Sequence, residues 1–512
     1  MLLDWSLAVA PLLLIILLMV RFRWGAARAG PAGWLAAVGI AALRFRAGIS
    51  VLAVAHVRAA FQALDVLLIV WAAFLLYRVA DEAGAIRILG KALPHLTADR
   101  GMQALLIGWA FASFLQGVGG FGVPVVVTAP ILLGLGFAPL TAVMVPSIGH
   151  AWSVTFGSLA SSFQALIAAS GLPGQDLAPE SAALLAAAGV VCGWMVARIA
   201  DGPAGARRLV CPVLILGVVM GAVQYWLATR GLWNIAGFGG GLAGLAVGLF
   251  VARAYRGPKQ DAAPVGLGTV AQALSGYAAL VAITLVVQLV PSVRSALSGI
   301  ALHLDLPATE TGRGYAIAAA TAGPIVLLRH AGAVLLYASA VAYGLYRWAG
   351  SYSAGALTRI VTGTARGVLP STIGIVSMVG LASVMSQSGM TDVLARGLAQ
   401  SVGALFPVVA PWIGALGAFI SGSNTSSNLL FVPLQQRTAE LLHLRVTRIL
   451  AAQTAGGAIG SVVAPTKIVV GVGSAGGGVS EGEVLRHLLV YVMGLVAFVS
   501  VVVWVWLWAG AR

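Results

Sequence analysis

Long apolar stretches recur along the chain from residue 5 to residue 509, and no polar block between them is long enough for a separate domain. Many of them approach the roughly 20 residues that a helix needs to cross a bilayer. Several others are too long, or too interrupted by glycine, to be one helix. The pattern therefore predicts an all-α polytopic membrane protein with about 12–14 transmembrane helices and additional re-entrant pieces. The apolar segments lie at 5–20, 32–43, 61–80, 103–135, 140–169, 181–199, 209–229, 233–252, 268–291, 314–346, 367–387, 404–420, 448–471 and 486–509.

The composition supports this class over the alternatives. Hydrophobic residues make up 60% of the 512 residues and charged residues only 9%, whereas soluble domains carry roughly a quarter charged residues. A transmembrane β-barrel would show short segments of alternating polarity instead. We therefore expect residues 1–512 to form one integral membrane domain embedded in the lipid bilayer.

The excess of basic residues defines an expected topology. The chain has 30 Lys and Arg against 15 Asp and Glu, a net charge of +15, and the basic residues cluster between apolar stretches as the positive-inside rule requires. This explanation needs no nucleic acid partner. The rule places the N-terminus and the segment 292–313 outside the cell. Three basic residues, Arg437, Arg445 and Arg448, fit this topology poorly. The segments expected in the cytoplasm are 21–31, 78–100, 198–208, 253–262 and 347–366.

Several patterns are missing or uninformative. Cys192 and Cys211 lie in or beside apolar segments and are expected to be packing residues. The seven histidines are scattered without a His-Glu-x-x-His pattern, so we expect no metal site, no cofactor and no enzyme activity. The apolar run before Arg21 lacks a small-residue cleavage site and predicts a retained first span.

Two interruptions of the apolar pattern resemble each other. Phe114–Pro124 and Phe419–Pro433 both open on Phe-aliphatic-polar-Gly, continue with small or polar residues, and close on Val-Pro. A second broken segment follows each, at 139–160 and at 448–471. Glycine and proline at corresponding places in two halves are typical of transporters with inverted repeats.

This pattern predicts a re-entrant hairpin and a broken helix in each repeat, within 103–160 and within 404–471. A hairpin tip in the membrane leaves backbone groups unpaired and is tolerated only where it lines a cavity. Free amides and helix N-termini there attract a carboxylate, while carbonyls and hydroxyls can hold a cation. The alternative is that the glycines only permit close helix packing. The candidate substrate- and ion-binding residues are Gln116, Gly117, Gly119, Gly120, Gly122, His150, Ser421, Ser423, Asn424, Thr425, Ser426, Ser427, Asn428, Thr454, Gly456, Gly457 and Lys467.

The stretches Phe114–Phe137, Gly414–Gln435 and Ala451–Pro465 resemble the signature sequences of the lactate permease family, a branch of a larger group of ion transporters. The resemblance extends across the chain and is weak between 170 and 370. It implies a secondary transporter of the bacterial inner membrane that moves a small organic anion, such as L-lactate or glycolate, by cation symport. It also implies a scaffold and a mobile transport unit with elevator-like movement. Elevator-type relatives are often homodimers, and the sequence leaves the oligomeric state open.

Three positions depart from this family. Lactate carriers of the family usually have Glu at the position of Gln116, Asp at that of Asn424 and Lys at that of Ser461. A carboxylate is the natural proton carrier, because burial raises its pKa. With both acids absent, the coupling ion could be a proton carried by His150, or Na⁺ held by Ser423, Asn424 and Thr425.

Other basic groups and other functions stay open. Lys467 could neutralise a substrate carboxylate or extend to a helix end, and Arg329–His330 adds further basic groups in the expected span 314–346. The altered tips could also suit a dicarboxylate or a sulfonate on the same fold. An anion channel or a membrane sensor is the alternative from a different class, although a channel would show a continuous polar stripe.

Overall fold

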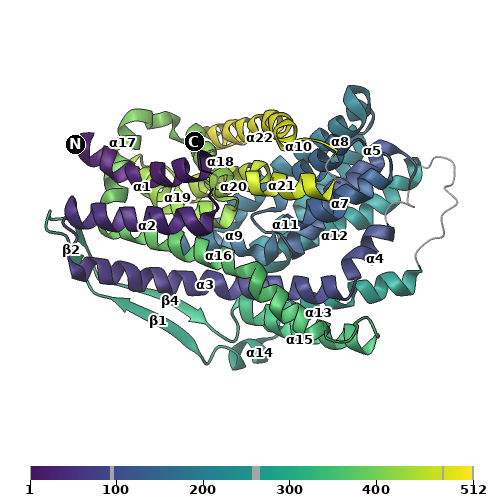
Figure 1. Cartoon of the computed structure of the whole chain (residues 1–512), viewed down its shortest axis with the longest axis horizontal. Helices are drawn as coiled ribbons and strands as arrows, with labels where there is room; N and C mark the ends of the chain where they lie inside the picture. Colours follow the sequence, from purple (N-terminus) through teal and green to yellow (C-terminus); the bar gives the residue numbers. More distant parts are fainter. Residues whose placement is uncertain are drawn as a thin grey trace.

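The structure is a computed structural model that describes residues 2–22, 24–92, 97–120, 122–255, 266–475 and 478–509. Most long helices run along the longest axis of the molecule (Figure 1). The first part of the chain forms α1 (Leu2–Val20), α2 (Ala26–Leu43), α3 (Ile49–Glu82), α4 (Ala85–Ala92), α5 (Arg100–Gln103), the π-helical segment η2 (Ala104–Phe111), α6 (Ala112–Val118), α7 (Val123–Gly134), α8 (Pro139–Gly149), the short turns η3 (Ala151–Ser153) and η4 (Ser158–Ala160), α9 (Ser161–Ser170), α10 (Gly174–Arg208), α11 (Val210–Thr229), α12 (Trp233–Ala252) and η5 (Arg253–Tyr255).

The second part begins after the gap at 256–265 and contains all the described strands. It forms α13 (Leu267–Leu289), α14 (Pro291–Ala296), β1 (Ala301–Leu306), β2 (Thr309–Glu310), β3 (Ala316–Ile317), β4 (Ala320–Val326), α15 (Ala331–Trp348), α16 (Ala356–Gln387), α17 (Met390–Val402), η6 (Gly403–Leu405), α18 (Phe406–Ser421), α19 (Asn424–Leu441), α20 (Val446–Gly460), η7 (Ser461–Val463), α21 (Pro465–Ser474) and α22 (Glu481–Ala509).

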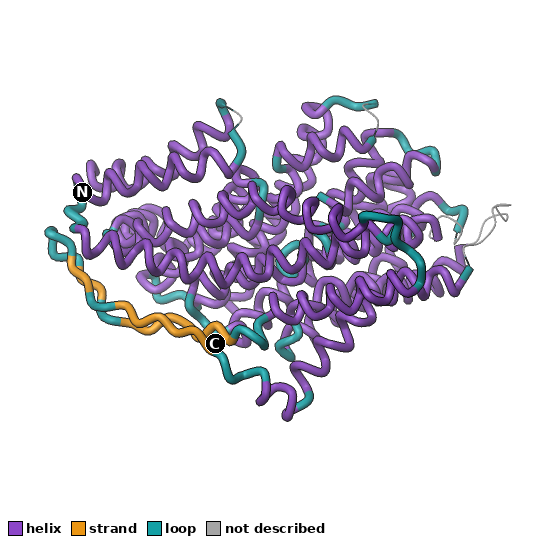
Figure 2. The backbone as a smooth tube through the Cα atoms, turned by 60° about the horizontal axis from the view of Figure 1, so that its bottom comes forward, coloured by secondary structure: helices purple, strands orange, loops and turns teal. Residues whose placement is uncertain are grey.

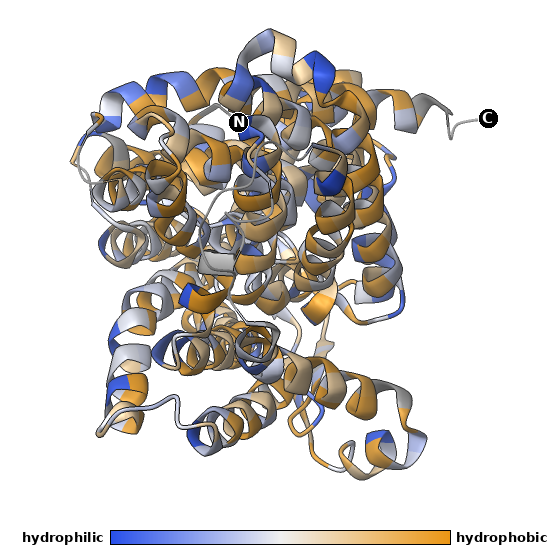
Figure 3. Ribbon diagram, turned by 90° about the vertical axis from the view of Figure 1, so that its right-hand side faces the viewer, coloured by the Kyte–Doolittle hydropathy of each residue, from blue (hydrophilic) through white to orange (hydrophobic). Residues whose placement is uncertain are grey.

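Length and composition make this a multi-pass membrane protein. Among the described residues, ten helical segments are long and apolar enough to cross a bilayer, or eleven if the pair α20–α21, bent by 45°, is one span. Large apolar side chains such as Phe250 and Val490 are exposed on the helices, as lipid contact requires. Seen close to end-on, the helices carry hydrophobic residues on outward as well as inward faces (Figure 3). The described residues thus give ten or eleven candidate spans against the expected 12–14, and Leu3–Met19 and Val123–Gly134 are shorter apolar helices.

The purely helical prediction is wrong between residues 301 and 326. Antiparallel strands β1 and β4 pair there, with Ala301 opposite Val326, and β2 pairs with β3. The hairpin lies along the outside of the helices (Figure 2) and contacts α3. The expected loop 292–313 therefore contains α14 and strands, and the expected span 314–346 is helical only from Ala331.

Helices break within the four segments that the glycines and prolines indicated. The backbone between α6 and α7 includes Gly120 and Gly122 with φ of +60° and +89°, and Gly422 between α18 and α19 has φ of +75°. These left-handed conformations suit glycine because it has no Cβ. Eleven irregular or short-turn residues, 150–160, separate α8 from α9, and η7 separates α20 from α21.

Glycines let α12 approach this broken region. A Cβ on Gly237 would lie 2.7 Å from the carbonyl oxygen of Phe156, and one on Gly240 would lie 2.9 Å from that of Met220 in α11. The first glycine therefore holds the break 150–160 against α12, and the second brings α11 and α12 together. Small residues permit such backbone contact between membrane helices.

We predict that Gly237→Ala destabilises the protein by about 1–3 kcal/mol, because the added methyl group must displace backbone. Gly344→Ala is the matched control, since nothing lies within 4 Å of a Cβ at this position inside α15. The measurement is thermal unfolding of the detergent-solubilised protein. Equal unfolding temperatures for the two variants would contradict the close approach of α12 to the break.

Candidate functional site

The irregular segment 150–160 is the unusual part of the fold. All of its residues are buried, and three consecutive non-glycine residues, Ser158, Leu159 and Ala160, have φ of 47°, 54° and 68°. Such left-handed residues cost about 1–3 kcal/mol each and persist only where the surroundings enforce them. Strain of this kind is concentrated at functional sites, so the contacts of this segment indicate where the site lies.

The start of α19, next to the second hairpin tip, contacts this segment through side-chain amides. The Nδ2 of Asn424 donates to the hydroxyls of Thr155 (3.1 Å) and Thr454 (3.3 Å). One turn further along α19, the Nδ2 of Asn428 donates to the Thr454 hydroxyl and to the carbonyl oxygen of Ser162, both at 2.9 Å. The amides thereby join α19 to α20, to the break 150–160 and to the start of α9.

A further bond, 3.1 Å between the hydroxyls of Ser162 and Thr425, closes the group. Within the described chain, the Oδ1 atoms of Asn424 and Asn428 are buried and accept no hydrogen bond. Gly457 leaves the space that Asn424 Oδ1 occupies. Buried acceptors without donors are costly, so these two oxygens indicate a place for a ligand. We call the group the amide–hydroxyl cluster; it consists of Thr155, Ser162, Asn424, Thr425, Asn428 and Thr454.

The first hairpin tip contacts the same segment from another direction. A Cβ on Gly157 would lie 2.7 Å from Nε2 of Gln116, and Gly120 lies against the hydroxyl of Ser158. The Oε1 of Gln116 is buried and accepts no hydrogen bond from any described residue. The segment 150–160 therefore contacts both hairpins, and Gln116 of the first hairpin adds a third amide oxygen without a described hydrogen-bond partner.

A positive charge lies beside the second break. The ammonium of Lys467 donates to the Ser461 hydroxyl at 3.0 Å and has no ion-pair partner among the described residues. The Nδ1 of His150 is bonded to the carbonyl oxygen of Pro146 (2.6 Å), and its buried Nε2 has no described partner. Because α8 contacts η7, which contains Ser461, these groups belong to the same region.

Other predicted residues have structural contacts. Ser423 caps α19 by accepting from the backbone N–H of Ser426, Ser421 donates to the carbonyl of Gly417 at 2.7 Å, and Ser427 donates to that of Gly414 at 2.8 Å. The proposed sodium set is therefore divided: Ser423 turns to its own helix, whereas Asn424 and Thr425 belong to the amide–hydroxyl cluster.

The remaining predicted glycines are packing positions in this structure. Gly117 lies against the backbone of Phe238, Gly119 is next to the ring of Tyr77, and Gly456 lies against Pro411. Gly122 is also next to a packing side chain, since a Cβ at this position would lie 3.8 Å from Val470. These glycines therefore make the contacts that the close-packing alternative describes, whereas Asn424, Thr425, Asn428 and Thr454 are joined by side-chain hydrogen bonds.

The sequence did not single out Thr155, Ser158 and Ser162. Hydroxyl residues are common inside apolar segments, and no spacing distinguishes these from others. Their position in or next to a broken segment was the available signal, because a helix break needs side chains that satisfy free backbone groups.

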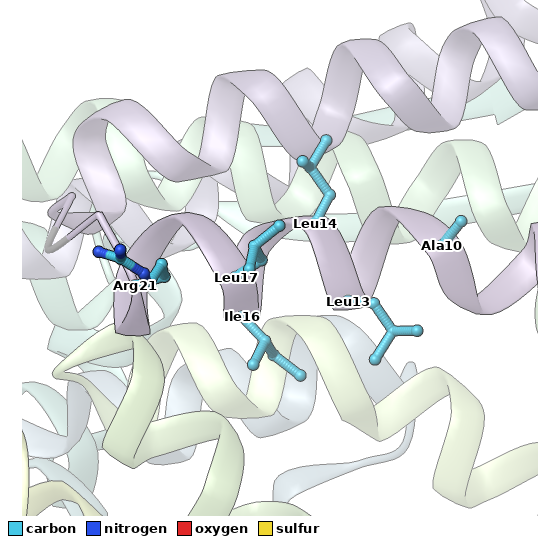
Figure 4. Close-up of a pocket in the computed structure, with 6 residues that line it drawn as sticks. All are labelled: Ala10, Leu13, Leu14, Ile16, Leu17 and Arg21. Carbon is cyan, nitrogen blue, oxygen red and sulfur yellow. The ribbon is translucent and has the colours of Figure 1, made fainter.

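Two cavities lie apart from the amide–hydroxyl cluster. One, of about 470 Å³, lies between the end of α1 and the second hairpin, and its lining includes Met19, Phe419, Ile420 and Thr466. The other is an open groove along α1 (Figure 4), formed by apolar side chains and by Arg21. The groove on α1 has the composition of a lipid-facing surface.

Comparison with known proteins shows which family the sequence matches. The family model for L-lactate permease matches residues 4–508. The L-lactate permease of Bacillus subtilis (strain 168) is 27% identical over 467 residues, which cover 83% of this chain and 82% of that protein. A putative L-lactate permease of Haemophilus influenzae is 26% identical over 523 residues, or 97% of each chain.

A glycolate permease, GlcA of Escherichia coli (strain K12), is 25% identical over 455 residues, covering 82% of this chain and 80% of that protein. Among solved structures, the Alcanivorax borkumensis YdaH transporter has a TM-score of 0.47 and 15% identity, covering 87% of this chain and 86% of that one. The family consists of permeases, which are transport proteins and not enzymes. Since the family model covers almost the whole sequence, the chain belongs to the L-lactate permease family.

Proposed function

We propose that the protein is a secondary transporter of the bacterial inner membrane for a short 2-hydroxy monocarboxylate, such as L-lactate or glycolate, coupled to cation symport. The observation that carries the proposal is the amide–hydroxyl cluster, which joins the second hairpin to the strained break 150–160. The names of the relatives in the L-lactate permease family supply the substrate class.

The polar groups match both ends of a 2-hydroxy acid. Its carboxylate needs hydrogen-bond donors and a positive charge, which the ammonium of Lys467 provides. Its hydroxyl can donate to an open amide oxygen, and Asn424 Oδ1 and Asn428 Oδ1 are such acceptors. A substrate with both groups would satisfy donors and acceptors that are otherwise incompletely paired.

The same oxygens favour sodium as the coupling ion. Asn424 and Gln116 cannot release a proton, whereas amide and hydroxyl oxygens can coordinate Na⁺ at unwound membrane segments. The Oδ1 of Asn424 accepts no hydrogen bond from a described residue, and the hydroxyls of Thr155 and Thr454, which accept from its amide nitrogen, are further candidate ligands. Coupling to protons through His150 is the competing outcome.

Matched contacts support two related repeats and a mobile unit. Gly120 at the first hairpin tip lies against the Ser158 hydroxyl. At the second tip, a Cβ on Gly422 would lie 2.9 Å from the hydroxyl oxygen of Thr466. Each hydroxyl belongs to a broken segment. Both α10 and α22 pack on α8 and on α20. In this proposal the hairpins and broken helices move against a scaffold that includes α2, α3 and α16.

We predict saturable uptake of labelled L-lactate or glycolate by proteoliposomes, driven more strongly by an inward sodium gradient than by a pH gradient alone. Asn424→Ala should reduce uptake by about 10- to 100-fold, because an unpaired buried polar group costs roughly 1–3 kcal/mol. The matched control is Asn234→Ala, which removes another buried asparagine, bonded to Thr284.

Each part of this experiment can fail separately. Absence of saturable uptake of both acids would refute the proposed substrate class. Uptake by Asn424→Ala at the rate of Asn234→Ala would move the site elsewhere. Acceleration by a pH gradient alone, with no effect of sodium, would refute sodium coupling and assign the proton.

We further predict that Lys467→Gln raises KM for the transported acid by about 10- to 100-fold, since hydrogen bonds to charged groups contribute roughly 1.5–3 kcal/mol. Lys467→Arg keeps the positive charge and should change KM by only about a few fold. The initial rate of uptake against substrate concentration gives both values. Equal KM for the two variants would show that the charge of Lys467 does not bind the substrate.

A further inference from the structure

A polar cavity of about 440 Å³ lies where several helices end, and none of the open amide oxygens lines it. It is bordered by the end of α11, the starts of α10, α12 and α15, and by α14 and β4. Its lining includes the side chains of Arg230, Arg294, Arg329, His330, Gln164 and Trp233.

The three arginines concentrate positive charge around this cavity. None of them forms an ion pair with a carboxylate in the part of the chain that the structure describes. The guanidinium carbon of Arg230 lies 5.7 Å from the centroid of the Trp226 ring. The nearby Asp65 is already bonded to His330 Nε2 (2.8 Å) and to Gln164 Nε2 (2.7 Å). Asp176, next to the lining residue Gln175, is exposed.

Helix ends and topology do not account for all three arginines. Arg230 and Arg294 lie at helix C-terminal ends, where a cation is favoured. Arg329 precedes the N-terminus of α15, where a cation is disfavoured. Moreover, α11 separates Arg230 from the basic segment 198–208. If that segment is cytoplasmic, the cavity is on the external side, where the positive-inside rule does not call for arginine.

One helix connects the cavity with the amide–hydroxyl cluster. Gln164, which lines the cavity, lies in the first turn of α9, two residues after Ser162. Ser162 bonds to Thr425 and Asn428 in the cluster. Between them, Phe163 packs on Trp233 at 5.6 Å between ring centroids. A single turn of helix with an aromatic pair therefore separates the wall of the cavity at Gln164 from the cluster.

We propose that this cavity is the external entrance at which the transported carboxylate is captured before it reaches the amide–hydroxyl cluster; this rests on the proposed function. Guanidinium groups bind carboxylates in bidentate geometry. A cavity lined by one sign of charge raises the local concentration of a counter-charged ligand and its rate of association. The arginines thus act on capture, and the cluster acts on binding during translocation.

The first test uses the full-length protein in proteoliposomes with labelled L-lactate. The triple variant Arg230→Gln, Arg294→Gln, Arg329→Gln should raise KM at low ionic strength by about tenfold while kcat changes by less than about twofold. Added salt should raise KM of the wild type and bring it toward that of the triple variant. The control is Arg347→Gln, an exposed arginine at the opposite end of α15 from Arg329.

An unchanged KM in the triple variant, with normal wild-type uptake, would refute the entrance and leave the proposed function intact. Absence of wild-type uptake of L-lactate and glycolate would refute both. A kcat loss of tenfold or more with unchanged KM would also refute capture, since it would indicate a role in translocation.

A second test does not depend on folding of the triple variant. Arg329→Cys is prepared with Cys211→Ser, because Cys211 is exposed whereas Cys192 is buried. After reconstitution it is labelled from outside with a methanethiosulfonate that carries either a sulfonate or a trimethylammonium group. The negative label should raise KM for L-lactate and the positive label should lower it toward the wild-type value. Equal effects of the two labels would refute electrostatic capture.

Discussion

The structure depends on how an interrupted backbone is kept inside a membrane protein. The segment 150–160 connects α8 to α9 without a continuous helix. Its unpaired backbone N–H and C=O groups would be costly in lipid. Three left-handed residues add strain. Packing of α12 through Gly237, the hydroxyl contact of the first hairpin at Ser158 and the amide of Asn424 from α19 together hold the segment. In the proposed function, the groups that stabilise the break are also the groups that bind the substrate.

This arrangement explains why neutral amides can replace charges at such a site. Asn424 and Asn428 satisfy the hydroxyls of Thr155 and Thr454 while each keeps one acceptor open. A carboxylate at Asn424 would accept from both hydroxyls but could not donate to them. The positive charge enters from Lys467, whose ammonium lies at the hydroxyl of Ser461. In the proposed function, this amide network and the nearby ammonium form a binding site of low net charge for an anion that enters with a cation.

Sequence alone could predict the membrane class and the four breaks, because apolar length and clustered glycine and proline have direct physical consequences. It could not predict which side chains meet: Thr155 and Asn424 are far apart in sequence and are joined only by tertiary packing. The strands at 301–326 were missed because the alternation of leucine with His303 and Asp305 in β1 is only six residues long. In addition, the apolar stretch 314–346 that predicted one span contains both β4 and most of α15. The arginine cavity was also missed because only tertiary packing brings Arg230, Arg294 and Arg329 together from separate elements.

In the proposed function, substrate binds at the amide–hydroxyl cluster between the second hairpin and the break 150–160. The most direct measurement is an experimental density map of the protein in lipid with L-lactate and sodium. We expect density for the acid within hydrogen-bond distance of the amides of Asn424 and Asn428, on the side of Lys467. Density for the acid only in the apolar cavity beside Phe419, with the cluster unchanged, would contradict it.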